Sequence, residues 1–405
     1  MTAGTAAGIT GATPVLTRLA EFIAAPSPTP PGDVATVAGM VAEWSAAIGA
    51  TVTRQEVEPG LDNVLALLRF GPGRRLVFNT HMDVTNPDQQ VWSTPPYQPE
   101  LRDGRLYGRG ACDAKGSLAA MLTAMEALAR QPSGLYGEVL LTAVMGEEAG
   151  GLGSAYLVGQ GISGDGAVVG EPTGLRIASA HKGTYIRQVT FRGIAAHSAF
   201  PWLGRNAVLP AAAFCLLCEE QNAILAQSPH PLVGPATLTV TLISGGTLQN
   251  TVPGQATVTV DRRLIPGHTH ADCDDELTRI LERLTASRPD AEVEDISVIV
   301  ATSPSQTPDG APIVDAALAA AADIGRPQAG PVGFGAGCDM SKLVNTAGIP
   351  TVICGPGHLD QAHRPDEFVD VGQVEEAALL YERIARRFLA GPSPASPGPT
   401  EEVDR

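Results

Sequence analysis

Several imidazoles and carboxylates stand at points in the sequence where a metal site could be assembled. His81 follows the apolar run 76–78 within a few residues, and Glu147, Glu148 and Glu171 follow two further apolar runs in the same way. In an open α/β sheet, ligands bind outside the carboxyl ends of the parallel strands. These side chains are therefore expected to face one crevice.

Two further residues complete a candidate ligand set. Asp113 lies in a polar stretch just before an amphipathic run that is typical of a helix, and His363 follows an apolar run. Each residue alone is more often a cap or a satisfied polar group, but imidazole and carboxylate ligands without thiolate together suit zinc, cobalt or manganese. A single structural zinc needs only four ligands, usually including cysteine. Five ligands fit two ions that share a bridging carboxylate and clamp an attacking hydroxide. The five candidates are His81, Asp113, Glu148, Glu171 and His363.

The elements that would position these side chains are short strands alternating with helices. Asp83, two residues after His81, could accept a hydrogen bond from the imidazole and orient it. Four apolar runs have the character of strands buried on both faces of a sheet, and helical patterns lie between them. This alternation predicts an α/β fold with a mostly parallel sheet. The four runs are 76–78, 139–144, 167–169 and 350–353.

The pattern changes between residues 183 and 297. Strands in this segment alternate apolar and polar residues, and the order of elements is β-α-β-β-α-β, which is the ferredoxin-like arrangement. We interpret the segment as an inserted α+β domain. The remaining residues, 1–182 and 298–405, are expected to form one domain that contains the candidate ligands.

Length, charge and cysteine usage limit the class of protein. A chain of 405 residues is too long for one ordinary core, so two domains are expected. A formal net charge of -16 argues against nucleic acid or an anionic membrane surface as a partner. No secretory signal and no apolar run of membrane-spanning length is recognised. The six scattered cysteines are expected to be reduced, in a cytoplasmic protein.

The chain resembles the family of dinuclear zinc hydrolases that contains acetylornithine deacetylase, succinyl-diaminopimelate desuccinylase and carboxypeptidases. The resemblance rests on eight motifs that occur in the family's order from about residue 37 to 389. They are NTHMDV at 79–84, DGRLYGRGACDAKG at 103–116, MGEEAGGLGS at 145–154, GEPTG at 170–174, GIAAHSAFPWLGRNAV at 193–208, NTVPG at 250–254, DRRLIPG at 261–267 and GPGHLDQAHRPDEFV at 355–369.

The resemblance implies a role for each matching residue. His81 and Glu171 would hold one zinc, Glu148 and His363 the other, and Asp113 would bridge them, with a cis peptide bond after it. The fold implied is a metallopeptidase catalytic domain with an inserted ferredoxin-like dimerisation and lid domain.

Other matching residues would serve catalysis and substrate binding. Glu147 would be the general base and later the general acid, and His197 would reach across a homodimer to stabilise the oxyanion. Asn250 and Arg263 would bind the carboxylate of the substrate, and Gly355 would line the pocket. Two positions depart from the family's pattern: Met82 occupies a variable position and changes little, and Cys338 stands where relatives often have Ser or Thr, so a hydroxyl contact to the substrate is not expected from this position.

The resemblance favours hydrolysis of the amide bond of an N-acyl amino acid. A glutamate at position 171 is typical of deacylases and carboxypeptidases, and an aspartate is typical of aminopeptidase-like members. Zinc is the expected metal, with cobalt or manganese as alternatives. A carboxypeptidase or dipeptidase acting on short peptides, and a non-catalytic homologue that binds acyl-amino acids, remain alternatives.

Two unrelated readings fit less well. GRGACDAKGS has its lysine before the glycine and serine, which is the wrong order for a phosphate-binding Walker loop. The same stretch lacks the third glycine of a dinucleotide-binding fingerprint. Neither a nucleotide hydrolase nor a dehydrogenase is therefore predicted.

Overall fold

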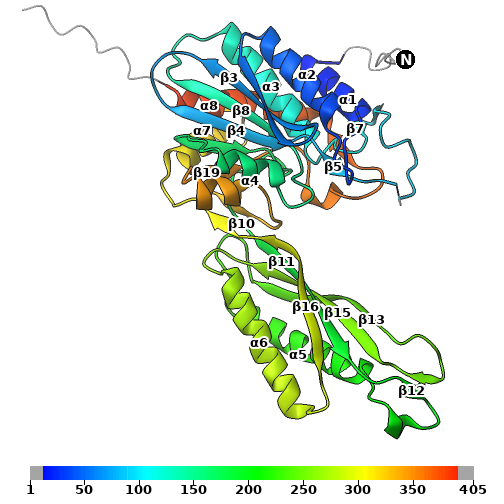
Figure 1. The fold of residues 1–405 in the computed structure, drawn as a ribbon. Helices are drawn as coiled ribbons and strands as arrows, with labels where there is room; N and C mark the ends of the chain where they lie inside the picture. The colour runs from blue at the N-terminus through cyan, green and yellow to red at the C-terminus, as the bar shows by residue number, and fades with distance from the viewer. Residues whose placement is uncertain (1–11, 89, 391–405) are drawn as a thin grey trace, which may run out of the picture.

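The computed structural model describes residues 12–88 and 90–390, and its two largest sheets lie in separate lobes (Figure 1). The larger sheet has nine strands, and four neighbouring strands at its centre, β19, β9, β4 and β8, are parallel. The outer strands pair antiparallel, except that β18 runs parallel to β10. The predicted α/β fold with a mostly parallel sheet is confirmed, and the sheet is mixed because its outer strands pair antiparallel. In sheet order the strands are β17 (Ser305–Gln306), β10 (Ala178–His181), β19 (Thr351–Ile353), β9 (Gly166–Val169), β4 (Arg75–His81), β8 (Glu138–Val144), β3 (Leu61–Arg69) and β2 (Thr51–Glu58), with β18 (Val332–Phe334) beside β10.

The central strands are buried on both faces, as their continuous apolar runs predicted. In β4, Leu76 and Phe78 belong to the main core, whereas Val77 between them packs in a second cluster on the opposite face. Val168 and Val169 in β9 divide in the same way. This alternation follows from the two-residue period of a strand.

Helices cover both faces of the larger sheet. The main core lies under α1, α2, α3, α7 and α8, and the second cluster lies under α4 and a π-helical turn, η2. The bounds are α1 (Pro14–Ala24), α2 (Ala35–Ala47), α3 (Lys115–Arg130), α4 (Leu152–Gly159), α7 (Pro312–Asp323), α8 (Val371–Phe388) and η2 (Lys342–Thr346). Short strands and turns complete the lobe: β1 (Pro28–Thr29) with β5 (Val84–Thr85), β6 (Glu100–Arg102) with β7 (Arg105–Tyr107) and β20 (Phe368–Asp370), and η3 (Leu359–Gln361).

The smaller lobe has the predicted ferredoxin-like order of elements. Its four strands pair antiparallel in the order β13-β15-β11-β16, and α5 and α6 pack on the sheet. The last strand continues to Thr302, past the expected boundary at 297, and the division into two folding domains stays a prediction. The elements are β11 (Gly183–Arg192), β12 (Ala196–His197), η1 (Pro201–Leu203), α5 (Val208–Leu225), β13 (Thr237–Gly245), β14 (Thr251–Val252), β15 (Gln255–Leu264), α6 (His270–Ser287) and β16 (Val293–Thr302).

The helix α5 departs from one expectation. Among the described residues it alone has the length and apolar content of a membrane-spanning helix, although no such run was predicted from the sequence. Ala211, Phe214 and Cys218 on one side of α5 pack in the core of the smaller lobe. The opposite side leaves Leu209 and Leu216 exposed. The apolar residues of α5 therefore form two faces: one packs in the core of the smaller lobe, and the other is exposed.

Candidate metal centre

The carboxyl ends of the parallel strands deliver most of the predicted ligands. His81 is the last residue of β4, Glu147 and Glu148 follow β8, and Glu171 follows β9. Gly146, with a φ of 69°, turns the chain directly after β8 and so directs the two glutamates into the crevice. The sheet topology therefore gathers these side chains where the sequence predicted them.

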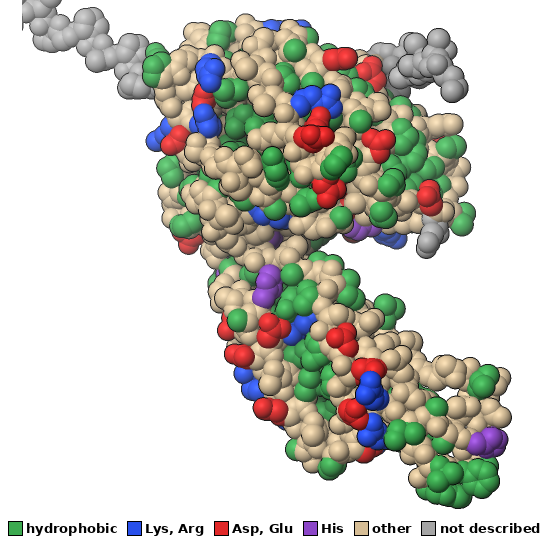
Figure 2. Space-filling model, in the orientation of Figure 1, with side chains coloured by type: hydrophobic (Ala, Val, Ile, Leu, Met, Phe, Trp, Pro, Cys, Tyr) green, Lys and Arg blue, Asp and Glu red, His purple; other side chains and the backbone are tan. Residues whose placement is uncertain are grey.

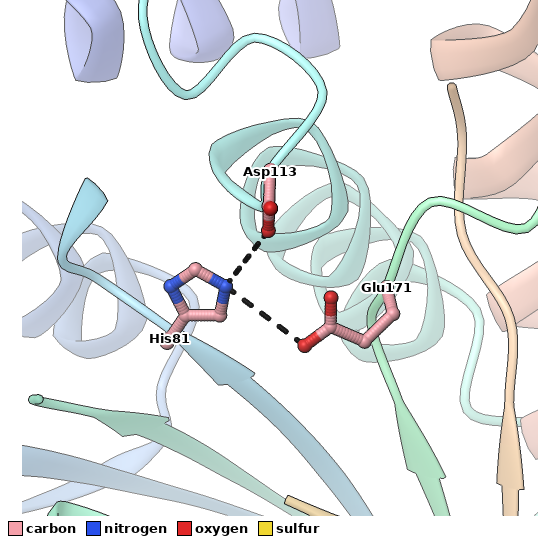
Figure 3. Close-up of side chains that lie close together, drawn as sticks. All are labelled: His81, Asp113 and Glu171. Carbon is pink, nitrogen blue, oxygen red and sulfur yellow. Dashed lines mark hydrogen bonds and ion pairs between the residues drawn. The ribbon is translucent and has the colours of Figure 1, made fainter. Parts of the chain in front are cut away.

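Three of the predicted ligands form the first group. The Nε2 atom of His81 lies 3.1 Å from Asp113 Oδ1 and 3.9 Å from Glu171 Oε1 (Figure 3). All three side chains are buried. Asp113 lies in the turn before α3, and the peptide bond to Ala114 is cis, as the resemblance predicted. These ligand atoms lie within 4.8 Å of one another, which is close enough to hold one ion.

The second group contains the other oxygen of Asp113. His363 Nε2 lies 3.4 Å from Asp113 Oδ2 and 3.0 Å from Glu148 Oε2. The ligand atoms of this group also lie within 4.8 Å of one another. One carboxylate, that of Asp113, thus directs one oxygen to each histidine. This is the orientation that a bridging ligand between two cations requires.

The charge balance of the cluster also fits cations. Burial and the nearby Asp113 carboxylate raise the pKa of both Glu148 and Glu171 above the ordinary value. Burial alone would lower the pKa of His81, but the Asp113, Glu171 and Asp83 carboxylates raise it well above its usual value. Buried carboxylates that crowd in this way are stabilised by positive charge between them. The five residues therefore fit two divalent ions, and oxygen and imidazole ligands suit zinc, cobalt or manganese.

Asp83 orients the cluster differently from the expected carboxylate–imidazole contact. His81 Nδ1 is 2.9 Å from the backbone oxygen of Asp83, whereas the Asp83 carboxylate is 3.7 Å away. A proton on Nδ1 donated to that carbonyl leaves Nε2 free to bind a metal. The buried carboxylate instead accepts hydrogen bonds from the backbone N–H groups of Glu147 (3.1 Å) and Glu148 (3.2 Å), and from Thr29 Oγ1 (3.0 Å). Asp83 thus fixes both glutamates after β8.

Glu147 has the properties of a proton carrier. Burial, and after it the negative charge of Asp339, raises the pKa of Glu147 to about 8. A group that accepts and returns a proton near neutral pH works best with a pKa in this region. Asp339 was not predicted from the sequence. It is itself held by Ser154 Oγ at 2.7 Å and by Lys342 Nζ at 3.0 Å. No spacing signal marks it, because it comes from a loop beside η2.

Gly355 lies beside a candidate metal ligand, and Arg263 lies near the junction of the two lobes. A Cβ atom on Gly355 would lie 2.6 Å from the backbone oxygen of Glu171, so only glycine permits this close approach. Arg263 lies near the end of β15 and donates to Thr184 Oγ1 (2.8 Å) and Asp261 Oδ2 (2.9 Å). Thr184 is at the start of β11, where the smaller lobe meets the larger one.

His197 and Asn250 are not brought to the metal cluster within this chain. His197 ends β12, at the end of the smaller lobe that is remote from β4 (Figure 1). Asn250 is beside it, and its backbone oxygen accepts a hydrogen bond of 2.8 Å from Ser198 N. Both residues are exposed. The two residues therefore share one place on the surface, remote from the five candidate ligands.

A family model described as peptidase family M20/M25/M40 matches residues 77–387. The chain belongs to this family. It is therefore a hydrolase that acts on amide bonds, as the sequence predicted. The match includes all five candidate metal ligands, the whole of the smaller lobe and part of the larger one.

Two curated relatives match over most of their length. The acetylornithine deacetylase of Pectobacterium carotovorum subsp. carotovorum (strain PC1) is 28% identical over 362 residues, which cover 87% of this chain and 91% of that protein. The succinyl-diaminopimelate desuccinylase of Parvibaculum lavamentivorans is 28% identical over 389 residues, which cover 92% and 94%.

Solved structures of the family share the fold. A tripeptidase of Staphylococcus aureus superposes with a TM-score of 0.78 at 21% identity, covering 93% of this chain and 98% of that one. An M20 family metallo-carboxypeptidase of Sulfolobus solfataricus gives 0.77 at 20% identity, covering 93% and 99%. A dinuclear metal-binding M20 peptidase of Bacillus subtilis gives 0.70 at 16% identity, covering 93% and 97%. These superpositions show that the chain shares their fold.

Proposed function

We propose that this protein is a two-metal hydrolase that cleaves the amide bond of an N-acyl amino acid, in the manner of acetylornithine deacetylase and succinyl-diaminopimelate desuccinylase. One observation carries the proposal: the two oxygens of Asp113 face two histidines in two adjoining ligand groups, with Glu147 beside them. The names of the curated relatives support the substrate class.

The chain's own residues divide the chemical work. Two divalent cations, with zinc as the expected ion, would supply the polarisation of a water and of the amide carbonyl. The Glu147 carboxylate accepts a proton from the attacking water and returns it to the departing amine nitrogen. The Asp83 carboxylate holds the backbone N–H of Glu147, so the base is fixed before substrate arrives. Arg263 is our candidate for binding the substrate carboxylate.

Two features bear on the choice between a deacylase and a peptidase. Glu171 provides the glutamate that the resemblance associates with deacylases and carboxypeptidases rather than aminopeptidases. Both curated relatives described above are deacylases by name, whereas two of the solved structures are named as a tripeptidase and a carboxypeptidase. The first feature is compatible with a deacylase and with a carboxypeptidase, and the names of the two curated relatives favour the deacylase.

A hydrolysis screen tests the proposal. The full-length protein, stripped with a chelator and reloaded with zinc or cobalt, would be offered N-acetyl-ornithine, N-succinyl-diaminopimelate, other N-acyl amino acids and short peptides. Release of free amine from an N-acyl amino acid, lost on chelation and restored by metal, would support the proposal. Hydrolysis of peptides alone would replace it with the peptidase alternative, and no hydrolysis by a protein that binds two ions would refute it.

We further propose that the protein is a cytoplasmic homodimer formed through α5 and β13. All six cysteines are free thiols, as expected for that compartment. The strand β13 is at one edge of the small sheet and exposes Leu242 and Ile243, and the adjoining α5 exposes Leu209, Leu216 and Ile224. An apolar edge strand beside an apolar helix face is an aggregation hazard unless it is covered. A second copy of the chain, placing its own β13 alongside, would cover both.

The Leu216→Glu variant is expected to be a monomer. Leu216 is 62% exposed near the middle of α5, so its replacement leaves the core intact but would bury an unpaired charge in the interface. The dimer dissociation constant should rise on the order of 10- to 100-fold. Sedimentation should then give the mass of one 41.8 kDa chain. Leu101→Glu, at an exposed leucine of the larger lobe, is the matched control and should stay dimeric. A dimeric Leu216→Glu protein would argue against this interface.

His197 provides a complementation test of the dimer. We expect His197→Ala chains and Glu147→Ala chains to be nearly inactive separately, because each lacks one group needed at every site. In a mixture with exchanged subunits, half of the dimers are mixed and one of their two sites is intact, so activity should recover to about one quarter of the wild-type value. No recovery in verified mixed dimers would contradict a role of His197 in the partner's site.

A further inference from the structure

A network of polar contacts joins the loop that carries Asp113 to the loop that carries His363. The side chains at the centre of this network are not candidate metal ligands. Glu367, which is fully buried, accepts hydrogen bonds from the backbone N–H groups of Cys112 (2.8 Å) and Asp113 (3.0 Å). Its other oxygen accepts from Arg109 Nη1 at 2.7 Å, and Arg109 is also buried. The turn before α3 is thus held by one carboxylate–guanidinium pair.

The network of contacts continues from Arg109 to His363 through Gln90. Arg109 Nη2 donates to Gln90 Oε1 at 2.6 Å, and Gln90 Nε2 donates to the backbone oxygen of His363 at 2.7 Å. The two halves of the Gln90 amide therefore face two different elements. Arg109 also lies over the ring of Trp92, with its guanidinium carbon 5.0 Å from the ring centroid, which fixes the loop that carries Gln90.

His363 depends on contacts from another loop to hold its position, because its side chain is largely exposed and its backbone conformation is unfavourable. Its side chain is 57% exposed, and its backbone has a φ of 62°, a left-handed conformation that is unfavourable for a residue with a side chain. Such conformations persist where neighbouring groups hold them. Asp366, with a φ of 54°, is held by the same loop, because its Oδ1 accepts from Ser93 N and Oγ. The loop that contains Gln90 and Ser93 thus holds both strained positions.

The buried Arg109–Glu367 pair is better explained as a means of holding loops in place than as a contribution to the free energy of unfolding. A buried ion pair adds little net stability, because both charges lose their hydration. Here the pair joins three loops that are far apart in the sequence, and it ends at two candidate ligands. The other two ligands of the first group, His81 and Glu171, take no part in these contacts and are buried.

We propose that Gln90 is a positioning residue for the second cation: it ties His363 to the Asp113 loop through Arg109 and Glu367, and its loss weakens the second site selectively. This inference rests on the proposed two-ion centre but not on the identity of the substrate. Substitution of groups that orient metal ligands lowers metal affinity about 10- to 100-fold. The affinity of the first site, built from His81, Asp113 and Glu171, should change little.

Cobalt titration of the metal-free, full-length protein tests the inference, with visible absorption and bound-ion counts as readouts. The wild type should take up two ions in two steps. Gln90→Ala should leave the first step unchanged and weaken the second about 10- to 100-fold. Gln90→Glu should weaken it as well, because an oxygen then faces the His363 carbonyl although the contact to Arg109 survives. Gln98→Ala, an exposed glutamine of the same loop, is the matched control and should titrate as the wild type.

Three results would overturn the inference: unchanged titration of both Gln90 variants, equal weakening of both steps, or uptake of a single cobalt ion by the wild type. Thermal denaturation of each metal-free variant separates a local change from a loss of folding, since Gln90 lies in a partly exposed loop and its variants should unfold as the wild type does. A wild type that binds two cobalt ions but hydrolyses nothing in the screen would refute the proposed function and leave this inference intact.

Discussion

Replacing Glu147 by glutamine is expected to lower kcat about 100- to 10,000-fold while the protein still binds two cations. The substitution keeps the size of the side chain and the backbone N–H that Asp83 holds, so the loop after β8 should keep its shape. It removes the only function that the mechanism asks of this side chain, which is to accept a proton from water and return it to the leaving amine. The measurement is steady-state kinetics together with the bound-metal count of the same preparation.

The metal count gives the Glu147→Gln experiment its meaning. Glu148, the neighbouring residue, belongs to the second ligand group, so a variant that lost metal would report on the cation site rather than on proton transfer. Glu58→Gln, at an exposed position on β2, is the control for the change of charge and should keep the wild-type kcat. Turnover near the wild-type rate in a fully loaded Glu147→Gln protein would remove Glu147 from its assigned role.

The part of the site that could be predicted from the residues alone is the part built by strand ends. His81, Glu148 and Glu171 each follow an apolar run, and parallel strands bring such positions together without help from any other element. Asp113 and His363 lie in loops whose positions no periodicity reports. Their residue types place them in the candidate ligand set, but which ion each would hold is implied only by the resemblance to a known family, and so is the cis bond after Asp113.

The rest depends on tertiary contacts that carry no local signal. The sequence places Asp83 near His81 but does not say which oxygen faces the imidazole, and the backbone oxygen is the nearer one. Gln90, Arg109 and Glu367 lie in separate loops, so their joint network becomes visible only once the chain has folded. The last strand of the smaller lobe runs five residues past the expected boundary, to Thr302, because strand pairing with β11 continues there.

Replacing Asp113 by asparagine is expected to abolish both cation sites together. Each Asp113 oxygen faces one histidine, Oδ1 toward His81 and Oδ2 toward His363, so an amide must turn its NH₂ group toward one of them. The variant also removes a negative charge that both cations would share. We expect affinity for each ion to fall by at least about 100-fold, which exceeds the loss typical of groups that only orient a ligand. The bound-metal count should drop below one ion per chain, and hydrolysis should disappear with it.

A graded series makes the role of Asp113 testable against a general loss of charge. Glu171→Gln changes a ligand of the first group only, so it should weaken one ion and spare the other. Asp103→Asn, at an exposed position with a φ of 51°, is the matched control, because asparagine also tolerates this backbone conformation. Two ions bound by Asp113→Asn with wild-type affinity would mean that the cations do not share this carboxylate. The two cations would then occupy independent sites, and the approach of both histidines to Asp113 would need another explanation.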